Sequence, residues 1–251
     1  MLRVSRERCR IAALVTGAAA VLLAAPLPAG AATTARGRPA ACSPGLAGSL
    51  KATSLAGAHQ LITVIAPTRQ ATTGVLVLWS RAGRCWKRFA GPWHAQLGAS
   101  GVSRTHREGD GTTPEGAYGI GPTMYGVLPD PGVKYRYHRL VCGDWWDEDP
   151  GSRTYNTFVH LACGAQPEFG GNSEALWLSP TAYAYFAFID YNSSPIRPGA
   201  GSAIFLHVSL NHPTNGCVAL PRSELVEVLR WLTPRLSPRI VIGTVADIRH
   251  V

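Results

Sequence analysis

Short segments rich in β-branched and aromatic residues, with Pro and Gly between them, limit this chain to a fold built mainly of strands. These segments occupy residues 60–66, 73–80, 85–90, 118–120, 183–190, 203–208 and 239–243. The 27 Gly and 19 Pro of the chain punctuate them as turns do between paired strands. We therefore predict mostly antiparallel strands in one domain, because the chain is long enough to bury one sizeable core.

One segment departs from this pattern and predicts a helix over residues 222–232. Its apolar residues recur at helical spacing on one face, and they are Leu225, Val228, Leu229 and Leu232. Pro221 suits the first turn of a helix, and the early Glu224 and late Arg230 match the helix dipole. The predicted fold class is therefore mainly β (α+β), with this helix packed on a sheet near the C-terminus.

The N-terminal residues 1–31 have the composition of a secretory signal peptide, with a basic start, the apolar run 11–25 and small residues at 29–31. Pro26 and Pro28 interrupt the apolar run before it reaches the roughly 18 residues that a membrane-spanning helix needs. We therefore expect cleavage and no stable membrane anchor, with an uncleaved anchor as the alternative. Residues 32–55 are expected to form a flexible lead-in, and residues 56–251 a single, monomeric domain.

The sequence carries a formal net charge of +9, and removal of residues 1–31 lowers it to +6 by taking away four Arg and one Glu. A basic exported protein is attracted to polyanions, and the polymers and acidic peptides of a cell wall are such partners. No clustered basic stripe of the kind that binds nucleic acid is present, so we expect no nucleic-acid partner. The predicted location is secreted or extracellular, in association with the wall.

The cysteine count predicts at least one free thiol. Five of the six Cys remain after cleavage, and an odd number in an exported protein leaves one unpaired. We favour Cys42 with Cys85 and Cys142 with Cys163, although spacing alone does not fix connectivity. This pairing leaves Cys217 free, and the Asn-Gly step before it predicts a presented, partly exposed thiol.

His207 ends an apolar, strand-like run and precedes Cys217 by ten residues. A thiol with a pKa of about 8.5 is mostly protonated at neutral pH, so acyl chemistry at a Cys needs a neighbouring base. We predict that Cys217 is a nucleophile and that His207 is its base. Gly216 permits a tight turn, after which the N–H groups of Gly216 and Cys217 face an oxyanion. Ser209 or Asn211 is expected to orient the second imidazole nitrogen.

The loop between His207 and Cys217 supplies the predicted substrate contacts, which are Ser209, Asn211, Thr214 and Asn215. His212 in this loop is an alternative base, although its place before Pro213 is more typical of a surface residue. Zinc binding by His207, His212 and Cys217 is a further alternative, which the absence of Cys-x-x-Cys and His-Glu-x-x-His patterns disfavours. We expect no metal and no organic cofactor.

Two separated segments resemble the L,D-transpeptidase (YkuD-type) catalytic domain family. Residues 214–218, Thr-Asn-Gly-Cys-Val, are similar to the family's Ser/Thr-His-Gly-Cys-Ile/Val segment, with Asn215 in the place of the His. Residues 108–121 contain Gly-Asp-Gly-Thr-Thr-Pro-Glu-Gly and resemble the family's Gly-Asp-Gly-x-Thr-Pro-x-Gly hairpin and strand. The resemblance spans residues 60–243, and the short gap from His207 to Cys217 indicates a short-loop subgroup. It implies a mixed or antiparallel β-sandwich with one packed helix.

The resemblance also implies an enzyme that acts on peptidoglycan stem peptides. In such an enzyme Cys217 attacks the carbonyl of the third stem residue, a diamino acid, and the terminal D-Ala leaves behind a thioester. An amine of a neighbouring stem then gives a cross-link, whereas water gives L,D-carboxypeptidase activity, and both outcomes stay open. A wall-binding module that has lost catalysis is the alternative from a different class.

Residues 135–149 form an unusual aromatic and acidic run that we predict to be a loop. Trp145 and Trp146 either line a groove for a glycan or stem peptide or fill a local core. The acidic residues of the run lack the spacing of an EF-hand, and no spacing among them singles out a glycosidase acid and base. Outside this run, Gly109 and Gly111 are assigned to a turn, and His160 to a structural place at the end of a strand.

Overall fold

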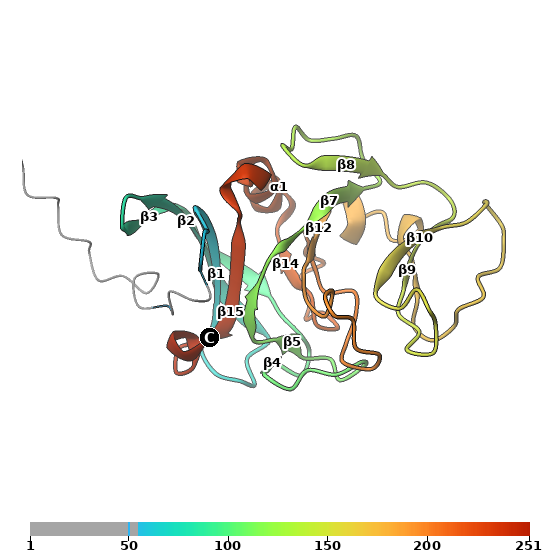
Figure 1. The fold of residues 1–251 in the computed structure, drawn as a ribbon, viewed down its shortest axis with the longest axis horizontal. Helices are drawn as coiled ribbons and strands as arrows, with labels where there is room; N and C mark the ends of the chain where they lie inside the picture. Colours follow the sequence, from blue (N-terminus) through green and yellow to red (C-terminus); the bar gives the residue numbers. More distant parts are fainter. Residues whose placement is uncertain (1–49, 51–54) are drawn as a thin grey trace, which may run out of the picture. The chain divides into compact units, whose positions relative to one another are not determined.

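The computed structural model describes residue 50 and residues 55–251 (Figure 1). The predicted signal segment 1–31, nearly all of the predicted lead-in and Cys42 lie outside the described residues. Cys85 forms a disulfide, and the expected pairing with Cys42 stays a prediction. None of the helices in the described residues is both long enough and apolar enough to cross a membrane.

The described chain is mainly β, as the sequence predicts. Its strands are β1 (Gln60–Ala66), β2 (Thr73–Ala82), β3 (Cys85–Gln96), β4 (Val102–Ser103), β5 (Thr113–Pro114), β6 (Gly116–Tyr118), β7 (Ile120–Gly126), β8 (Arg136–Arg139), β9 (Asp144–Asp147), β10 (Thr157–His160), β11 (Glu174–Ala175), β12 (Phe186–Ile189), β13 (Phe205–Val208), β14 (Val218–Leu220) and β15 (Arg239–Thr244). The helical segments are α1 (Arg222–Trp231) and the 3₁₀ turns η2 (Leu176–Leu178), η3 (Ala182–Ala184), η4 (Pro234–Leu236) and η5 (Ile248–His250).

Ten strands form one curled, mixed sheet in the order β6-β15-β1-β2-β3-β14-β13-β12-β7-β8. Antiparallel pairs such as β1 with β2 predominate, while β1 with β15, β13 with β14 and β7 with β8 pair in parallel. The continuous apolar sequence of β1 is explained by its central place, because a strand covered on both faces needs no polar alternation. The mixed sheet and the single α-helix confirm the predicted fold class.

Strands β13 and β14 place the candidate site between two hydrophobic cores. Their parallel register pairs Leu206 with Val218 and His207 with Ala219. Because side chains alternate across a strand, Leu206 and Val218 belong to the core that includes α1, whereas Phe205 and Cys217 belong to a second core on the other face. The second core gives Cys217 its surroundings.

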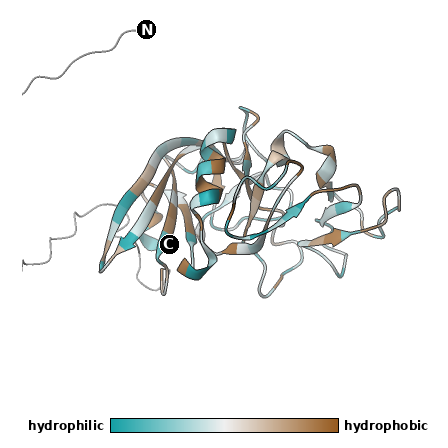
Figure 2. Ribbon diagram, turned by 90° about the horizontal axis from the view of Figure 1, so that it is seen from above, coloured by the Kyte–Doolittle hydropathy of each residue, from teal (hydrophilic) through white to brown (hydrophobic). Residues whose placement is uncertain are grey.

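Helix α1 packs on the first of these cores, as predicted. Leu225, Val228, Leu229 and Leu232 are all fully buried, and hydrophobic and hydrophilic residues alternate along the helix in Figure 2. Burial of each such side chain stabilises the fold by about 1.5–3 kcal/mol. Pro221 has φ −49° and occupies the cap position, so α1 begins at Arg222. The helix therefore supports β13 and β14 on the face of the sheet opposite to Cys217.

The second core is covered by a small three-stranded sheet, β10-β9-β11, which corrects the prediction that residues 135–149 form a loop. Residues 136–139 are strand β8 and residues 144–147 are strand β9. Trp146 is 3% exposed, and its ring centroid lies 4.7 Å from that of Phe188 and 5.0 Å from that of Phe205. For Trp146 the structure therefore supports the local-core alternative. We call residues 140–178 the lobe.

Two cross-links hold the lobe together. Cys142 and Cys163 form the predicted disulfide. The fully buried carboxylate of Asp144 lies 2.8 Å from Nε2 of His138 and 2.6 Å from Nδ1 of His160. His160 therefore has the structural place that the sequence predicts for it, at the end of β10.

Candidate active site

Cys217 is the free cysteine of the described residues, as predicted. It lies immediately before β14, and its sulfur is 3.3 Å both from the N–H of Phe205, which donates to it, and from the carbonyl of Ala203, to which the thiol donates. Only 9% of the residue is exposed, so the expectation of a partly exposed thiol is wrong. Burial raises the pKa of the Cys217 thiol well above its usual value, and Glu174 nearby raises it further.

The turn before Cys217 is held by Thr214. The Thr214 hydroxyl donates to the carbonyl of Cys217 at 2.7 Å and accepts the N–H of Gly216 at 3.2 Å. The backbone N–H of Thr214 also donates to the carbonyl of Leu97, and its carbonyl accepts the N–H of Ala99. Thr214 was predicted as a substrate contact, but its hydroxyl is engaged within the loop. The N–H of Gly216, predicted as an oxyanion donor, has Thr214 as its partner in this structure.

The Gly-Asp-Gly segment lies directly against this turn. Asp110 accepts hydrogen bonds from the N–H and the hydroxyl of Thr112, at 2.8 and 2.7 Å. Gly109 and Gly111 have φ of +72° and +69°, as a tight turn requires. A Cβ added to Gly216 would stand 2.9 Å from the carbonyl oxygen of Thr112. The two motifs that are separated in sequence therefore meet, and the glycines form the turn that was predicted.

His207 is buried on β13 and is neutral at neutral pH, because burial lowers its pKa to about 4. Nδ1 of its ring lies 2.9 Å from the carbonyl of Val208, and the backbone of Ala182 contacts the ring as well. Donation from Nδ1 to Val208 leaves Nε2 without a proton in the neutral ring. The predicted orienting partners Ser209 and Asn211 do not have this role. Ser209 instead accepts the N–H of Asn211 at 3.0 Å.

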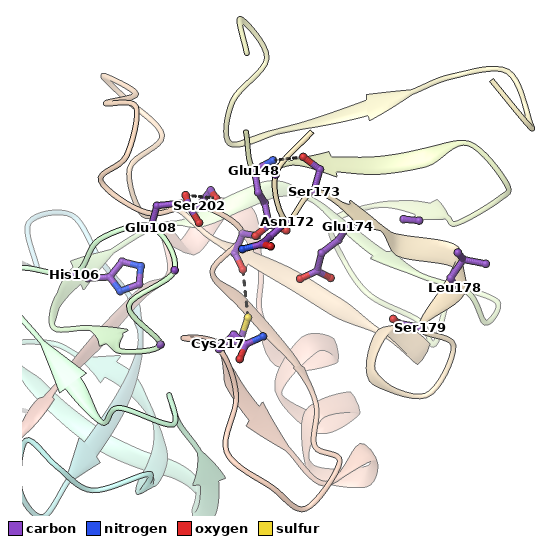
Figure 3. Close-up of a pocket in the computed structure, with 16 residues that line it drawn as sticks. His106, Glu108, Glu148, Asn172, Ser173, Glu174, Leu178, Ser179, Ser202 and Cys217 are labelled. Atoms are coloured by element: carbon purple, nitrogen blue, oxygen red, sulfur yellow. Dashed lines mark hydrogen bonds between the residues drawn. The ribbon is translucent and has the colours of Figure 1, made fainter. Parts of the chain in front are cut away.

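Two cavities meet at Cys217. A cavity of about 150 Å³ is lined by His207, Cys217 and other residues of the β13–β14 loop, and a cavity of about 700 Å³ lies beside the lobe. Cys217, Glu174 and Asn215 line both, and Figure 3 shows Cys217 and Glu174 at the larger one. The exposed His212 also lines the smaller cavity, near His207. The structure thus brings the predicted nucleophile and the predicted base to one cavity, whereas Ser209 and Asn211 line neither.

The larger cavity contains carboxylates that the sequence does not single out. Glu108, Glu148 and Glu174 all line it. Burial, followed by the charge of Glu174, raises the pKa of Glu148 to about 9, and burial raises the pKa of Glu174. The Tyr183 hydroxyl donates to Glu174, and the Tyr183 ring packs edge-to-face with that of His207 at a centroid distance of 5.8 Å. The acidic composition of residues 135–149 hinted at Glu148 alone.

Within residues 50 and 55–251, no group of three or more His, Cys, Asp and Glu side chains is arranged to hold a metal ion.

A comparison with models of protein families matches residues 73–244 to the family described as YkuD, L,D-transpeptidase catalytic domain. The matched range covers more than half of the 251 residues and includes both of the resembling segments and Cys217. A search of curated proteins and a search of solved structures found no match.

Proposed function

Because the chain belongs to the YkuD family of L,D-transpeptidase catalytic domains, we propose that it is an exported cysteine acyltransferase that acts on peptidoglycan stem peptides. One observation carries this proposal: the free thiol of Cys217 and the imidazole of His207 line the same cavity. The donor is a stem peptide whose third residue is the diamino acid, and the product is a thioester on Cys217.

The first step is attack by sulfur on the donor carbonyl. In the resting protein the proton stays on sulfur, because burial raises the pKa of Cys217 and lowers that of His207 to about 4. The proton moves to His207 only as the carbonyl carbon accepts the sulfur's electron pair, so thiolate formation is coupled to the bound substrate. A neutral His207 is already the form that accepts this proton.

The second step releases D-Ala. The carbon–nitrogen bond of the tetrahedral intermediate breaks, His207 returns its proton to the departing amine, and the thioester remains. The N–H groups of Gly216 and Cys217 hold the oxyanion before this collapse. For Gly216, this requires its N–H to exchange the Thr214 hydroxyl for the oxyanion. Asn215 serves as a substrate contact, supported by its exposed position at both cavities.

An amine of a second stem then resolves the thioester and gives a cross-link, while water gives carboxypeptidase activity from the same acyl-enzyme. Action outside the cell is supported by the N-terminal sequence and by the Cys142–Cys163 disulfide, since such bonds persist in oxidising compartments. The net charge of +9, which falls to +6 when the four Arg and one Glu of residues 1–31 are removed, also suits a protein that stays near wall polymers.

Covalent trapping tests this function. The strained amide of a carbapenem mimics the donor carbonyl, so incubation should give one adduct, which mass spectrometry locates on Cys217. The matched control is Cys217→Ala, which should stay unmodified. His207→Ala should form the adduct at least about 100-fold more slowly, in keeping with the usual contribution of a positioned base.

Product analysis separates the remaining alternatives. Incubation with tetrapeptide muropeptides should give cross-linked dimers, whereas tripeptides without dimers would assign the site to hydrolysis. Unchanged muropeptides together with an unmodified Cys217 would refute the enzyme and favour a wall-binding module.

A further inference from the structure

The cavity beside Cys217 is lined by acidic side chains, in contrast to the basic chain as a whole. The sequence carries a formal net charge of +9, yet Glu108, Glu148 and Glu174 line this cavity of about 700 Å³, and its lining includes no Lys or Arg. His106 lines it as well, and burial lowers the pKa of His106, which disfavours its cationic form. A cavity of this kind attracts a cation and repels a carboxylate.

Glu148 supplies a second observation that points to a ligand. The residue is 9% exposed, and its Oε1 atom is buried without any hydrogen-bond partner. Figure 3 shows the side chains of Glu148 and Glu174 extending from the lobe towards the side of the cavity where Cys217 lies. An unpartnered buried carboxyl oxygen is costly and rare in folded proteins. A donor group from a bound molecule removes this cost.

The neighbouring carboxyl groups do not supply that donor. Glu108 accepts hydrogen bonds from the hydroxyls of Ser202 and Tyr155, and Glu174 accepts one from the hydroxyl of Tyr183. Glu148 thus differs from both, because its Oε1 atom is left for a ligand. A metal ion does not fit this place, since the described residues contain no group of ligands arranged for one.

We propose that Glu148, with Glu174 beside it, forms a subsite that binds the protonated amine of the acceptor stem next to the thioester of Cys217. The inference rests on the proposed function and names the residues that favour an amine over water. An ammonium group offers three donors, which match an unpartnered carboxylate oxygen and a second carboxylate nearby.

The carboxylate also takes part in the proton balance of transfer. Glu148 is protonated in the resting protein, because burial raises its pKa to about 9, and it releases this proton to solvent as the ammonium binds. The ammonium then gives one proton to the carboxylate of Glu148, and the free amine forms a carbon–nitrogen bond with the thioester carbon. As the carbon–sulfur bond breaks, the second proton of the nitrogen passes through His207 to sulfur, and one N–H stays on the new amide. The products are the amide, the Cys217 thiol and a protonated Glu148, which is again the resting form. Charge and protons therefore balance without another reactant.

The test measures how an acyl-enzyme divides between two nucleophiles. Wild-type protein and Glu148→Gln are acylated with a tetrapeptide donor, and transfer and hydrolysis products are quantified by liquid chromatography and mass spectrometry. With an acceptor peptide that bears a protonated side-chain amine, the transfer-to-hydrolysis ratio should fall about tenfold or more in the variant. With hydroxylamine, which is uncharged at neutral pH, the same ratio should change less than about twofold.

The matched control is Glu168→Gln, which removes an exposed carboxylate of the lobe and should behave as wild type with both nucleophiles. Glu174→Gln gives the same test if Glu148→Gln does not fold. Equal ratios in variant and wild type, or an equal loss with both nucleophiles, would overturn the inference while leaving the proposed function intact. Slower acylation by the donor with an unchanged ratio would also overturn it, by placing the donor's amine in the subsite. A wild-type protein that forms no acyl-enzyme would overturn both.

Discussion

Gly216 adopts φ of +134°, a backbone conformation that side-chain-bearing residues rarely adopt. An added Cβ would lie 2.9 Å from the carbonyl oxygen of Thr112 and 3.1 Å from Cδ1 of Ile204. The first of these atoms belongs to the Gly-Asp-Gly turn and the second to the segment that leads into β13. The absence of a side chain at Gly216 is therefore what lets the two motifs close around Cys217.

We predict that Gly216→Ala lowers the free energy of unfolding by about 2–3 kcal/mol, as the sum of backbone strain and the clash with Thr112. It should also slow carbapenem acylation of Cys217 at least about tenfold, because the added methyl group displaces the sulfur of Cys217 and the N–H groups of residues 216 and 217 from their positions. Denaturant unfolding and the rate of adduct formation measure the two effects.

Gly83→Ala is the control for this prediction. Gly83 also has a positive φ, +61°, but an added Cβ there meets nothing within 4 Å. This variant should lower the free energy of unfolding by about 1 kcal/mol, through backbone strain alone, and keep the wild-type acylation rate. Similar acylation rates for the two variants would show that the closure around Gly216 does not matter for the chemistry.

At the level of elements, the spacing of apolar residues predicted a strand or helix correctly where one spacing runs through the whole segment. The strand predicted at residues 60–66 coincides with β1, and the helix predicted at 222–232 ends within one residue of α1. Residues 183–190 were predicted as one strand, but they begin in the 3₁₀ turn η3 and only Phe186–Ile189 pairs as β12. The strand β9 was missed because Asp144 and Asp147 look like loop residues. Both are fully buried, and their hydrogen-bond partners lie outside β9: Thr154 donates to Asp147, and His160 contacts Asp144.

Strand β9 connects the lobe to the nucleophile through Trp146. Its indole N–H donates at 3.1 Å to Oδ1 of Asn156, which also accepts the N–H of Ala203 at 3.0 Å. The carbonyl of Ala203 in turn accepts the thiol proton of Cys217 at 3.3 Å. The position of the sulfur therefore depends on how the lobe packs.

Trp146→Ala should lower the free energy of unfolding by about 3–5 kcal/mol, as the loss of a large buried side chain does. Carbapenem acylation of the remaining folded protein should slow, since Ala203 loses its support. Trp145→Ala is the matched change on the same strand. Trp145 is half-buried against Phe169 and Trp177, and its loss should cost about 1–2 kcal/mol and leave acylation unchanged. If the two variants acylate equally fast, Trp146 serves only the stability of the core.

At the level of the whole molecule, the sequence predicted which residues meet but not what surrounds them. The placement of His207 and Cys217 at one cavity follows from a parallel strand pair, β13 and β14, whose short connection is visible in the sequence. The burial of Cys217 and the carboxyl groups near it follow from the lobe, whose docking on the sheet depends on long-range contacts. Glu148 and Glu174 carry no local pattern that distinguishes them from surface acids.

The buried groups of the site also set how global stability depends on pH. Glu148 has a pKa of about 9 in the folded protein against a usual value of 4.5. Between these two values the folded state keeps a proton that the unfolded chain releases, so the contribution of Glu148 to stability falls as pH rises through this range.

His207 affects stability at acid pH instead. Its pKa of about 4 lies below the usual 6.5, so the unfolded chain binds the extra proton and stability falls as pH drops between these values.

Glu148→Gln should therefore flatten the alkaline side of the stability curve. Glutamine keeps the size of the side chain and cannot ionise, so the variant loses the proton release that accompanies unfolding of the wild type. Relative to wild type, it should gain about 1 kcal/mol or more in free energy of unfolding between about pH 6 and about pH 8. Chemical denaturation across this range measures the difference, with Glu168→Gln as the exposed control that should follow wild type. A constant difference between Glu148→Gln and wild type at all pH values would mean that Glu148 is ionised in the folded protein, as an ordinary surface acid is.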